Sequence, residues 1–334
     1  MVIIESYSTA VIMCVITMIC WGSWANTMKL TRKHWVFQLY YWDYSLGVLI
    51  FSLLLAFTLG STGTNGRAFL QDIAQADYKN LGYALLSGVI FNLANVLLVT
   101  VIDIAGMAIA FPIGVGLALV LGVIFGYIAK PLGNPVLIFS GLGAIVMAIV
   151  LDGIAYSRIP SVGKKSLILG IVLSVLTGIF MGFFYPMLVS SISSNLIVPE
   201  TGKLTPYTAI VLFSSGLFLS SFIWNYYFMR KPLRGDPVSF ADYFHKGSAR
   251  DHVVGVTGGL VWCLGFSLMT LAADKAGPAI SYGLGQGATM IAVVWGVFVW
   301  KEFQRAPRSV NKLLAAMFIF YLMGLSLLIS AKSN

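Results

Sequence analysis

An acidic side chain interrupts one of the apolar stretches of this chain. Asp43 follows Tyr41 and Trp42, about five residues into an apolar run that starts near residue 38. An ionisable group in such a run is costly to place in a membrane and is a functional candidate by default. Desolvation favours the neutral form of a carboxyl group, so Asp43 is a candidate to bind and release a proton. The alternative is a structural acid that pairs with Lys29, Arg32 or Lys33.

Uncharged amides form a second set of candidates. Asn92 and Asn95 are spaced i, i+3, so they share one face of a helix. Gln286 lies near the middle of a later apolar run, and Asn26 lies near the end of the first one. These amides can exchange hydrogen bonds with a polar solute. The alternative is that they tie helices together, since amide hydrogen bonds are common between membrane helices.

Aromatic side chains supply flat apolar faces against which a ring-shaped solute can stack. Those placed well inside apolar runs are Trp21, Trp24, Phe111, Tyr185, Trp262 and Tyr282. Trp24 and Tyr185 occupy comparable places in the two halves of the chain, so they are candidates for two opposite gates. Ordinary packing is the alternative interpretation for any of these rings.

Three further acids have structural interpretations. Asp152 lies close to the end of an apolar run, where a boundary role is expected. Asp103 and Asp274 each precede an Ala-Gly pair by two residues, which favours helix N-caps in tight turns.

These residues must be positioned by membrane helices. Only 10% of the 334 residues are charged, against about 25% in soluble domains. This composition excludes a soluble enzyme, a disordered chain and a nucleic-acid-binding domain. A helix of roughly 20 apolar residues crosses the bilayer, and the chain has ten such runs. We predict spans over 8–28, 38–60, 81–102, 105–127, 135–155, 167–190, 206–229, 253–273, 277–300 and 310–330.

The loops differ in their content of basic residues. Most of the 21 lysines and arginines lie in the loops that follow the first, fifth, seventh and ninth spans. Cytoplasmic loops are enriched in these residues. The distribution predicts both termini outside. Cys14, Cys20 and Cys263 all lie in apolar runs, so no disulfide framework is expected.

An internal repeat relates the two halves. A shift of 171 residues aligns residues 88–127 with 259–298 without a gap, and it matches Asp103-x-Ala-Gly with Asp274-x-Ala-Gly. Five spans separate the paired helices, so the repeat is predicted to be inverted, with helices 1–5 in residues 1–160 and helices 6–10 in residues 161–334. Inverted repeats are typical of secondary transporters. Channels and scaffolds stay as alternatives.

Several segments resemble known transporters. Five plus five helices resemble the drug/metabolite transporter superfamily, and the segment 20–24 (CWGSW) resembles its glucose/ribose porters. Segments 41–45 (YWDYS) and 56–60 (AFTLG) are similar to plant ureide permeases, and 106–116 and 258–262 to the rhamnose–proton symporter. The chain lacks the long insert of the plant proteins. The resemblance implies uptake of a small polar solute together with protons.

The expected fold is therefore an all-α integral membrane protein of ten helices in two inverted repeats. The expected function is a secondary active transporter, a proton symporter that imports a small neutral ring solute. A nucleobase, nucleoside or ureide is slightly favoured over a monosaccharide such as rhamnose or glucose. The alternatives are a drug or metabolite exporter and a passive facilitator. The chain has no P-loop, HExxH or GxSxG motif, so we expect no enzyme, cofactor or metal site.

The expected partners are the solute, protons and the lipid bilayer, without nucleic acid, and a homodimer stays open. The expected location is a multi-pass position in a bacterial inner (cytoplasmic) membrane.

Overall fold

The computed structural model describes residues 1–158, 167–233, 235–304, 306–307 and 309–332. Within this part of the chain, ten helices are long and apolar enough to cross a membrane, as predicted. In chain order the spans are α1 with η1 (Tyr7–Ser23, Trp24–Leu30), α2 (Phe37–Phe57), α4 (Tyr78–Ala105), η2 with α6 (Ala110–Val115, Gly116–Ala129), α7 (Pro135–Ser157), α8 (Leu167–Ser191), α9 with α10 (Pro206–Ser221, Trp224–Arg230), α12 (Ala249–Ala276), α13 with α14 and η3 (Pro278–Gly285, Ala288–Val294, Trp295–Val299), and α15 (Ser309–Ser330).

Three short helices lie outside these spans. They are α3 (Phe69–Gln75), α5 (Met107–Ile109) and α11 (Phe240–Lys246). No β-strand forms in the described residues, whose only β-type pairing is one isolated bridge between Ile192 and Leu204. This is the all-helical architecture that a bilayer requires, because each helix satisfies its own backbone hydrogen bonds.

Polar caps fix where several helices begin. The Asn134 side chain accepts a hydrogen bond from the Val136 backbone N–H at 2.9 Å, and Pro135 occupies the first turn of α7. Capping boxes begin both α11, through Ser239 and Asp242, and α12, through Ser248 and Asp251.

The repeated Asp-x-Ala-Gly segments are where two matching helices end. Both α4 and α12 have 28 residues and end before a glycine with φ of 83°, Gly106 and Gly277. A left-handed conformation at these positions favours glycine. The N-cap interpretation of Asp103 and Asp274 is wrong, because both lie inside the last turn of the preceding helix. The predicted start of the fourth span at residue 105 was also too early, because hydropathy does not register this turn.

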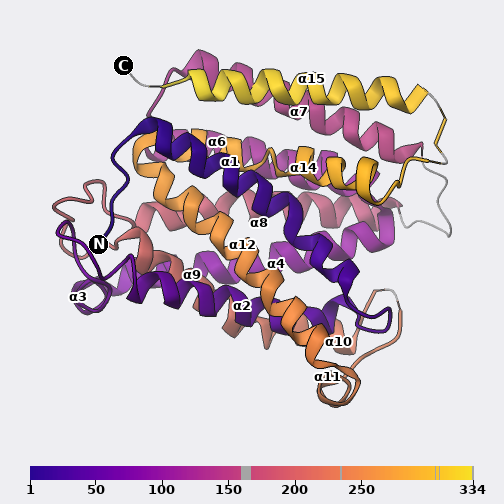
Figure 1. The fold of residues 1–334 in the computed structure, drawn as a ribbon, viewed down its shortest axis with the longest axis horizontal. Helices are drawn as coiled ribbons and strands as arrows, with labels where there is room; N and C mark the ends of the chain where they lie inside the picture. The colour runs from indigo at the N-terminus through magenta and orange to yellow at the C-terminus, as the bar shows by residue number, and fades with distance from the viewer. Residues whose placement is uncertain (159–166, 234, 305, 308, 333–334) are drawn as a thin grey trace.

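The helices pack in pairs that mix the two halves of the chain. Figure 1 shows α7 and α15 side by side at one edge, and α4 packs along α8 while α12 packs along both α1 and α2. Both termini lie at the same end of the molecule (Figure 1). The Met1 ammonium donates to the Asn65 carbonyl at 2.6 Å, and the Asn134 N–H donates to the Ala331 carbonyl at 2.9 Å.

We call this end the terminal face. The opposite end, formed by residues 29–36, 231–233, 235–248, 300–304 and 306–307, is called the basic face. Five of the cations assigned to loops on the basic face lie outside the described residues, namely Lys164, Lys165, Arg234, Arg305 and Arg308. The predicted assignment of this face to the cytoplasm stays a prediction.

Candidate functional site

A column of aromatic rings occupies the centre of the helical bundle. Trp262 of α12 stacks on Trp21 of α1, with ring centroids 5.8 Å apart and an interplanar angle of 10°. The Trp21 Nε1–H donates to the Trp262 carbonyl oxygen at 3.3 Å. Phe91 of α4 lies 4.8 Å from Trp262, and Tyr44 of α2 lies 6.2 Å from it. The rings of four spans therefore meet at Trp262.

The column continues toward the terminal face through two stacked tyrosines. Tyr185 of α8 and Tyr282 of α13 have centroids 5.3 Å apart, and neither side chain is exposed. The Tyr282 hydroxyl donates to the Met181 carbonyl oxygen at 3.1 Å. Phe184 joins this pair to Phe91 and to Tyr282, at 4.9 and 6.4 Å. The predicted rings fill the space between the helices in this conformation instead of lining an open cavity.

Trp24 lies at the other end of the column, nearer the basic face. Its ring is 4.7 Å from Tyr44. Trp24 begins η1, the segment of 3₁₀ helix that ends the first span. Five of the six predicted aromatic residues thus belong to one continuous column, namely Trp21, Trp24, Tyr185, Trp262 and Tyr282.

Phe111 and Asn26 have other neighbours. Phe111 lies in η2, a wider helical turn of a kind frequent at functional sites, and its ring packs edge-on against Tyr156 at 6.0 Å. The Asn26 Oδ1 accepts a hydrogen bond from Trp300 Nε1 at 2.6 Å, close to the basic face. Neither residue joins the aromatic column in this conformation.

Asn92 makes hydrogen bonds to two neighbouring helices. Its Nδ2 donates to the Leu217 carbonyl and to the Ser220 and Ser221 hydroxyls of α9, at 3.0, 2.8 and 3.2 Å. Its Oδ1 accepts from the Tyr41 hydroxyl of α2 at 2.8 Å. In this conformation Asn92 ties α4 to α9 and α2, which is the alternative that the sequence left open.

Asn95 and Gln286 carry fewer contacts. Asn95 Nδ2 donates to the Tyr41 hydroxyl at 3.1 Å. Gln286 follows α13 at a break in the ninth span, where its side chain is almost completely buried, and its carbonyl accepts from the Thr289 hydroxyl at 3.0 Å. Broken helices at membrane depth are tolerated where they are buried in protein or line a cavity, so this break is a suitable place for a solute contact.

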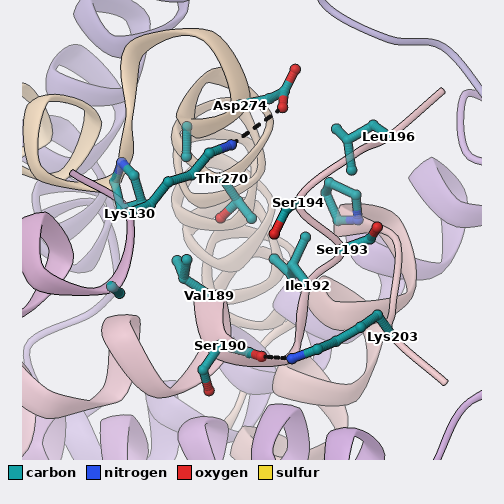
Figure 2. Close-up of a pocket in the computed structure, with 14 residues that line it drawn as sticks. Lys130, Val189, Ser190, Ile192, Ser193, Ser194, Leu196, Lys203, Thr270 and Asp274 are labelled. Atoms are coloured by element: carbon teal, nitrogen blue, oxygen red, sulfur yellow. Dashed lines mark hydrogen bonds and ion pairs between the residues drawn. The ribbon is translucent and has the colours of Figure 1, made fainter. Parts of the chain in front are cut away.

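A pocket of about 330 Å³ opens at the terminal face. Figure 2 shows the Lys130 side chain pointing toward Asp274, and their Nζ and Oδ1 atoms are 3.6 Å apart. On the other side of the pocket, the Lys203 ammonium donates to the Ser190 carbonyl (Figure 2). Thr270 also lines the pocket, one helical turn from Phe266 of the aromatic column. The pocket therefore offers both charges and hydroxyl groups next to the column.

The sequence did not identify this pocket. Its polar residues are at helix ends and in the loop before α9, which hydropathy treats only as breaks between spans. Because Asp274 was predicted to be a helix cap, its pairing with Lys130 was not predicted. The repeat of Asp103 and Asp274 was the one signal that pointed to this position.

A second polar cluster surrounds Asp43 near the basic face. His252 Nδ1 lies 3.0 Å from both carboxylate oxygens, and the Tyr243 hydroxyl donates to Oδ1 at 2.5 Å. The side chain of Asp43 is only 3% exposed. Burial, and then the hydrogen bond to Asp43, raises the pKa of Tyr243 above its ordinary value. Trp35 covers the cluster, with its ring 5.0 Å from that of His252.

Two ion pairs join segments of the basic face near this cluster. Lys29 Nζ lies 2.8 Å from Glu302 Oε1, and the Arg32 guanidinium lies 2.7 Å from the buried Asp251 carboxylate. Two of the three cations considered as partners of Asp43 therefore pair elsewhere. The partners of Asp43 come instead from α11 and α12, more than 190 residues away in the sequence.

Asp152 is buried without partners. Its side chain has no exposed surface, and neither carboxyl oxygen has a hydrogen-bond partner among the described residues. The boundary role expected from the sequence does not describe this position. The described residues contain no group of three or more His, Cys, Asp or Glu side chains that could hold a metal ion, and the three cysteines are free and buried.

The fold and these sites together define a multi-pass integral membrane protein with polar clusters at both ends of a buried column. The ureide permease family model matches residues 40–159 and 156–331. The chain belongs to the ureide permease family. The two matched segments meet at the predicted boundary between the halves.

Similar proteins support this assignment. Ureide permease 1 of Arabidopsis thaliana is 22% identical over the full length of both chains, and ureide permease 5 of the same plant is 20% identical over 98% of this chain and 95% of its own. Both relatives are permeases and not enzymes, in agreement with the sequence analysis. The first alignment spans 391 positions, more than the 334 residues of this chain, so the plant protein carries residues that this chain lacks.

A crystal structure also resembles this fold. It covers 96% of this chain and 97% of its own, with a TM-score of 0.56 and 13% sequence identity. At this identity the likeness concerns the fold alone. The wider placement in the drug/metabolite transporter superfamily stays a prediction.

Proposed function

We propose that this chain is a proton-coupled secondary carrier that brings a ureide into the cytoplasm. Membership of the ureide permease family is the observation that carries the proposal. A ureide has several N–H donors and carbonyl acceptors on a small, flat framework. The terminal-face pocket offers an ammonium, a carboxylate and hydroxyl groups to such a solute, and the adjacent rings offer stacking faces.

In this proposal the solute enters from the terminal face. The pocket is its first site, and Trp21, Trp262, Tyr185, Tyr282, Asn95 and Gln286 contact it when the column separates. Trp24 and Tyr185, at opposite ends of the column, act as the two gates. The matching helices α4 and α12 and their identical glycine turns support two repeats that rock about the column.

Two ion pairs across the basic face support alternating access. Lys29 with Glu302 and Arg32 with Asp251 must separate before the solute can leave on that side. Asp43 is the proposed link between protons and this gate. In the closed state its carboxylate accepts hydrogen bonds at α11 and α12, and protonation would weaken the contacts that hold Tyr243 and His252 in place.

The direct test is transport by the purified protein in proteoliposomes. A labelled panel of allantoin, uracil, hypoxanthine, uridine, rhamnose, glucose and ribose is offered with and without an inward proton gradient. The proposal expects allantoin to accumulate when the gradient is present. Uptake of a nucleobase or sugar in preference to allantoin would contradict the solute class, and equilibration without accumulation would favour a passive facilitator.

Substitutions in the pocket test its role. Lys130→Gln and Asp274→Asn should each raise the KM for uptake severalfold. Lys79→Gln is the matched control, because Lys79 is an exposed lysine at the start of α4 outside the pocket. If the KM values of both pocket variants equal that of Lys79→Gln, the pocket is excluded as an entry site.

The remaining expectations belong to this proposal. We place the protein in a bacterial cytoplasmic membrane with both termini outside, and a homodimer stays open. Labelling of a single cysteine at residue 332 from outside intact cells tests the orientation.

A further inference from the structure

Asp152 differs from the other buried acids of the protein. It lies on α7, five residues before the helix ends at Ser157. Asp43, Asp72 and Asp251 are also buried, but each accepts hydrogen bonds from donors on other segments. Both oxygens of Asp152 lack such donors in the described structure. A buried carboxylate without a partner is strongly unfavourable, and such a group takes up a proton instead.

Among the residues that the structure describes, the elements around α7 bring no cation to Asp152. The helix packs against α15, α5, η2, α6 and α13. The titratable or charged side chains on these elements are Tyr127 of α6, Tyr282 of α13, and Lys312 and Tyr321 of α15, with Tyr156 and Arg158 at the end of the seventh helix. Lys312 and Arg158 are exposed. Of these groups, Tyr156 lies one helical turn from Asp152 on α7, and Tyr321 lies on α15, the helix that packs along α7.

Polar groups connect Asp152 with the basic face. Tyr156 lies one helical turn along α7, and its hydroxyl donates to Glu302 Oε2 at 3.4 Å. The other oxygen of Glu302 accepts from Lys29 Nζ at 2.8 Å, and both of these charged side chains are partly exposed. Tyr156 and Glu302 therefore form a route from solvent to the turn that carries Asp152.

A second connection leads toward the solute column. The Tyr321 hydroxyl contacts the Thr289 hydroxyl, which in turn donates to the Gln286 carbonyl at 3.0 Å. Gln286 lies at the break in the ninth span, beside Tyr282 of the column. Asp152 thus lies between a polar route to the basic face and a hydrogen-bonded segment next to the proposed solute site.

We propose that Asp152 carries one of the protons that move with the solute. The inference rests on the proposed function, because it needs a proton-coupled carrier. In the conformation described here the carboxyl group holds its proton. When the Lys29–Glu302 pair separates and water enters along Tyr156, the O–H bond breaks, the proton passes to water at the basic face, and the carboxylate that remains is hydrated.

Asp43 and Asp152 then have different tasks. Asp43 accepts hydrogen bonds from two donors at the gate, while Asp152 has none and stores a proton inside the bundle. Loss of Asp152 should uncouple transport from the proton gradient without removing the solute site.

The test uses the full chain in proteoliposomes. The wild type is measured first, and a failure to accumulate any ureide would reject the proposed function itself. In Asp152→Asn, gradient-driven accumulation should be lost while exchange of labelled for unlabelled solute continues. Asp236→Asn is the matched control, because it makes the same chemical change at an exposed residue near the basic face. Undiminished accumulation in Asp152→Asn, with a working wild type, would overturn the inference.

Two further measurements separate coupling from folding. Infrared difference spectra across a pH titration should contain one C=O band of a protonated carboxyl group that is present in the wild type and in Asp236→Asn but missing from Asp152→Asn, while the bands of the acids common to all three proteins, Asp43 included, stay. Asp152→Glu should recover accumulation with a shifted pH profile. If exchange is lost in Asp152→Asn and is not recovered in Asp152→Glu, or if the infrared band persists in Asp152→Asn, the proton role is refuted.

Discussion

The two asparagines of α4 should respond in opposite ways to substitution. They share a helix face, yet Asn92 makes four hydrogen bonds to α9 and α2, while Asn95 donates one to Tyr41. Asn92→Ala should therefore lower stability and spare solute affinity. Asn95→Ala should leave stability almost unchanged and raise the KM for the solute.

The size of the effect follows from the number of hydrogen bonds. A hydrogen bond between membrane helices contributes about 0.6 kcal/mol on average, with a maximum of about 1.7. Four such bonds give about 2.4 kcal/mol for Asn92, which is roughly a 60-fold change in the unfolding equilibrium. One bond gives about 0.6 kcal/mol for Asn95.

The assay is reversible unfolding in mixed micelles with increasing sodium dodecyl sulfate. A double-mutant cycle of Asn92→Ala with Tyr41→Phe isolates the bond between the Tyr41 hydroxyl and Asn92 Oδ1, and it should give a coupling free energy near the average value. Similar losses of stability in the two alanine variants would refute the distinction between a helix tie and a solute contact. A large rise in KM for Asn92→Ala alone would refute the same distinction.

Three more predictions concern packing, the basic face and pH. Gly259→Val should prevent close packing of α12 on α2, because a Cβ at this position would overlap the Tyr44 carbonyl oxygen. Gly82→Val should fold normally, because nothing lies within 4 Å of a Cβ there. Identical gel-filtration profiles of the two variants would contradict this. Arg32→Ala should remove a partly exposed ion pair of about 1 kcal/mol, so roughly fivefold faster amide exchange is expected at the start of α12; unchanged exchange would show that the pair contributes nothing. A hydrogen bond from Lys246 lowers the pKa of Asp242 to about 2, whereas the pKa of an ordinary aspartate is about 3.9. The capping box of α11 should therefore be intact above pH 4 and should weaken as the pH falls toward 2. Amide exchange of residues 239–242 across this range measures it, and loss near neutral pH would be the opposite result.

Some features of the fold follow from local sequence, and others do not. The ten spans could be predicted because length and hydropathy decide whether a helix crosses the bilayer, and both are properties of a single segment. The ends of the spans depend on more than hydropathy. The fourth span was placed too early, since the turn at Gly106 depends on a backbone conformation that hydropathy does not record.

The candidate residues show the same division. The aromatic residues that the sequence selected do meet at Trp262 and Tyr185, because inward-facing rings of a bundle have few other places to pack. The pairing of Asp43 with Tyr243 and His252 could not be read from spacing, since about 200 residues separate these partners. The difference between Asn92 and Asn95 was also hidden, because it depends on which helix lies opposite each amide.

The sequence alone determined that this is a helical membrane protein with ten spans, and its segments 41–45 and 56–60 already resembled the family to which it belongs. Only the tertiary structure decided which polar groups have partners. It paired Lys130 with Asp274 at a pocket, placed Asp43 in a hydrogen-bonded gate and left Asp152 alone. The physical reason is that insertion depends on each helix separately, whereas the state of a buried polar group depends on the donors that other helices bring to it.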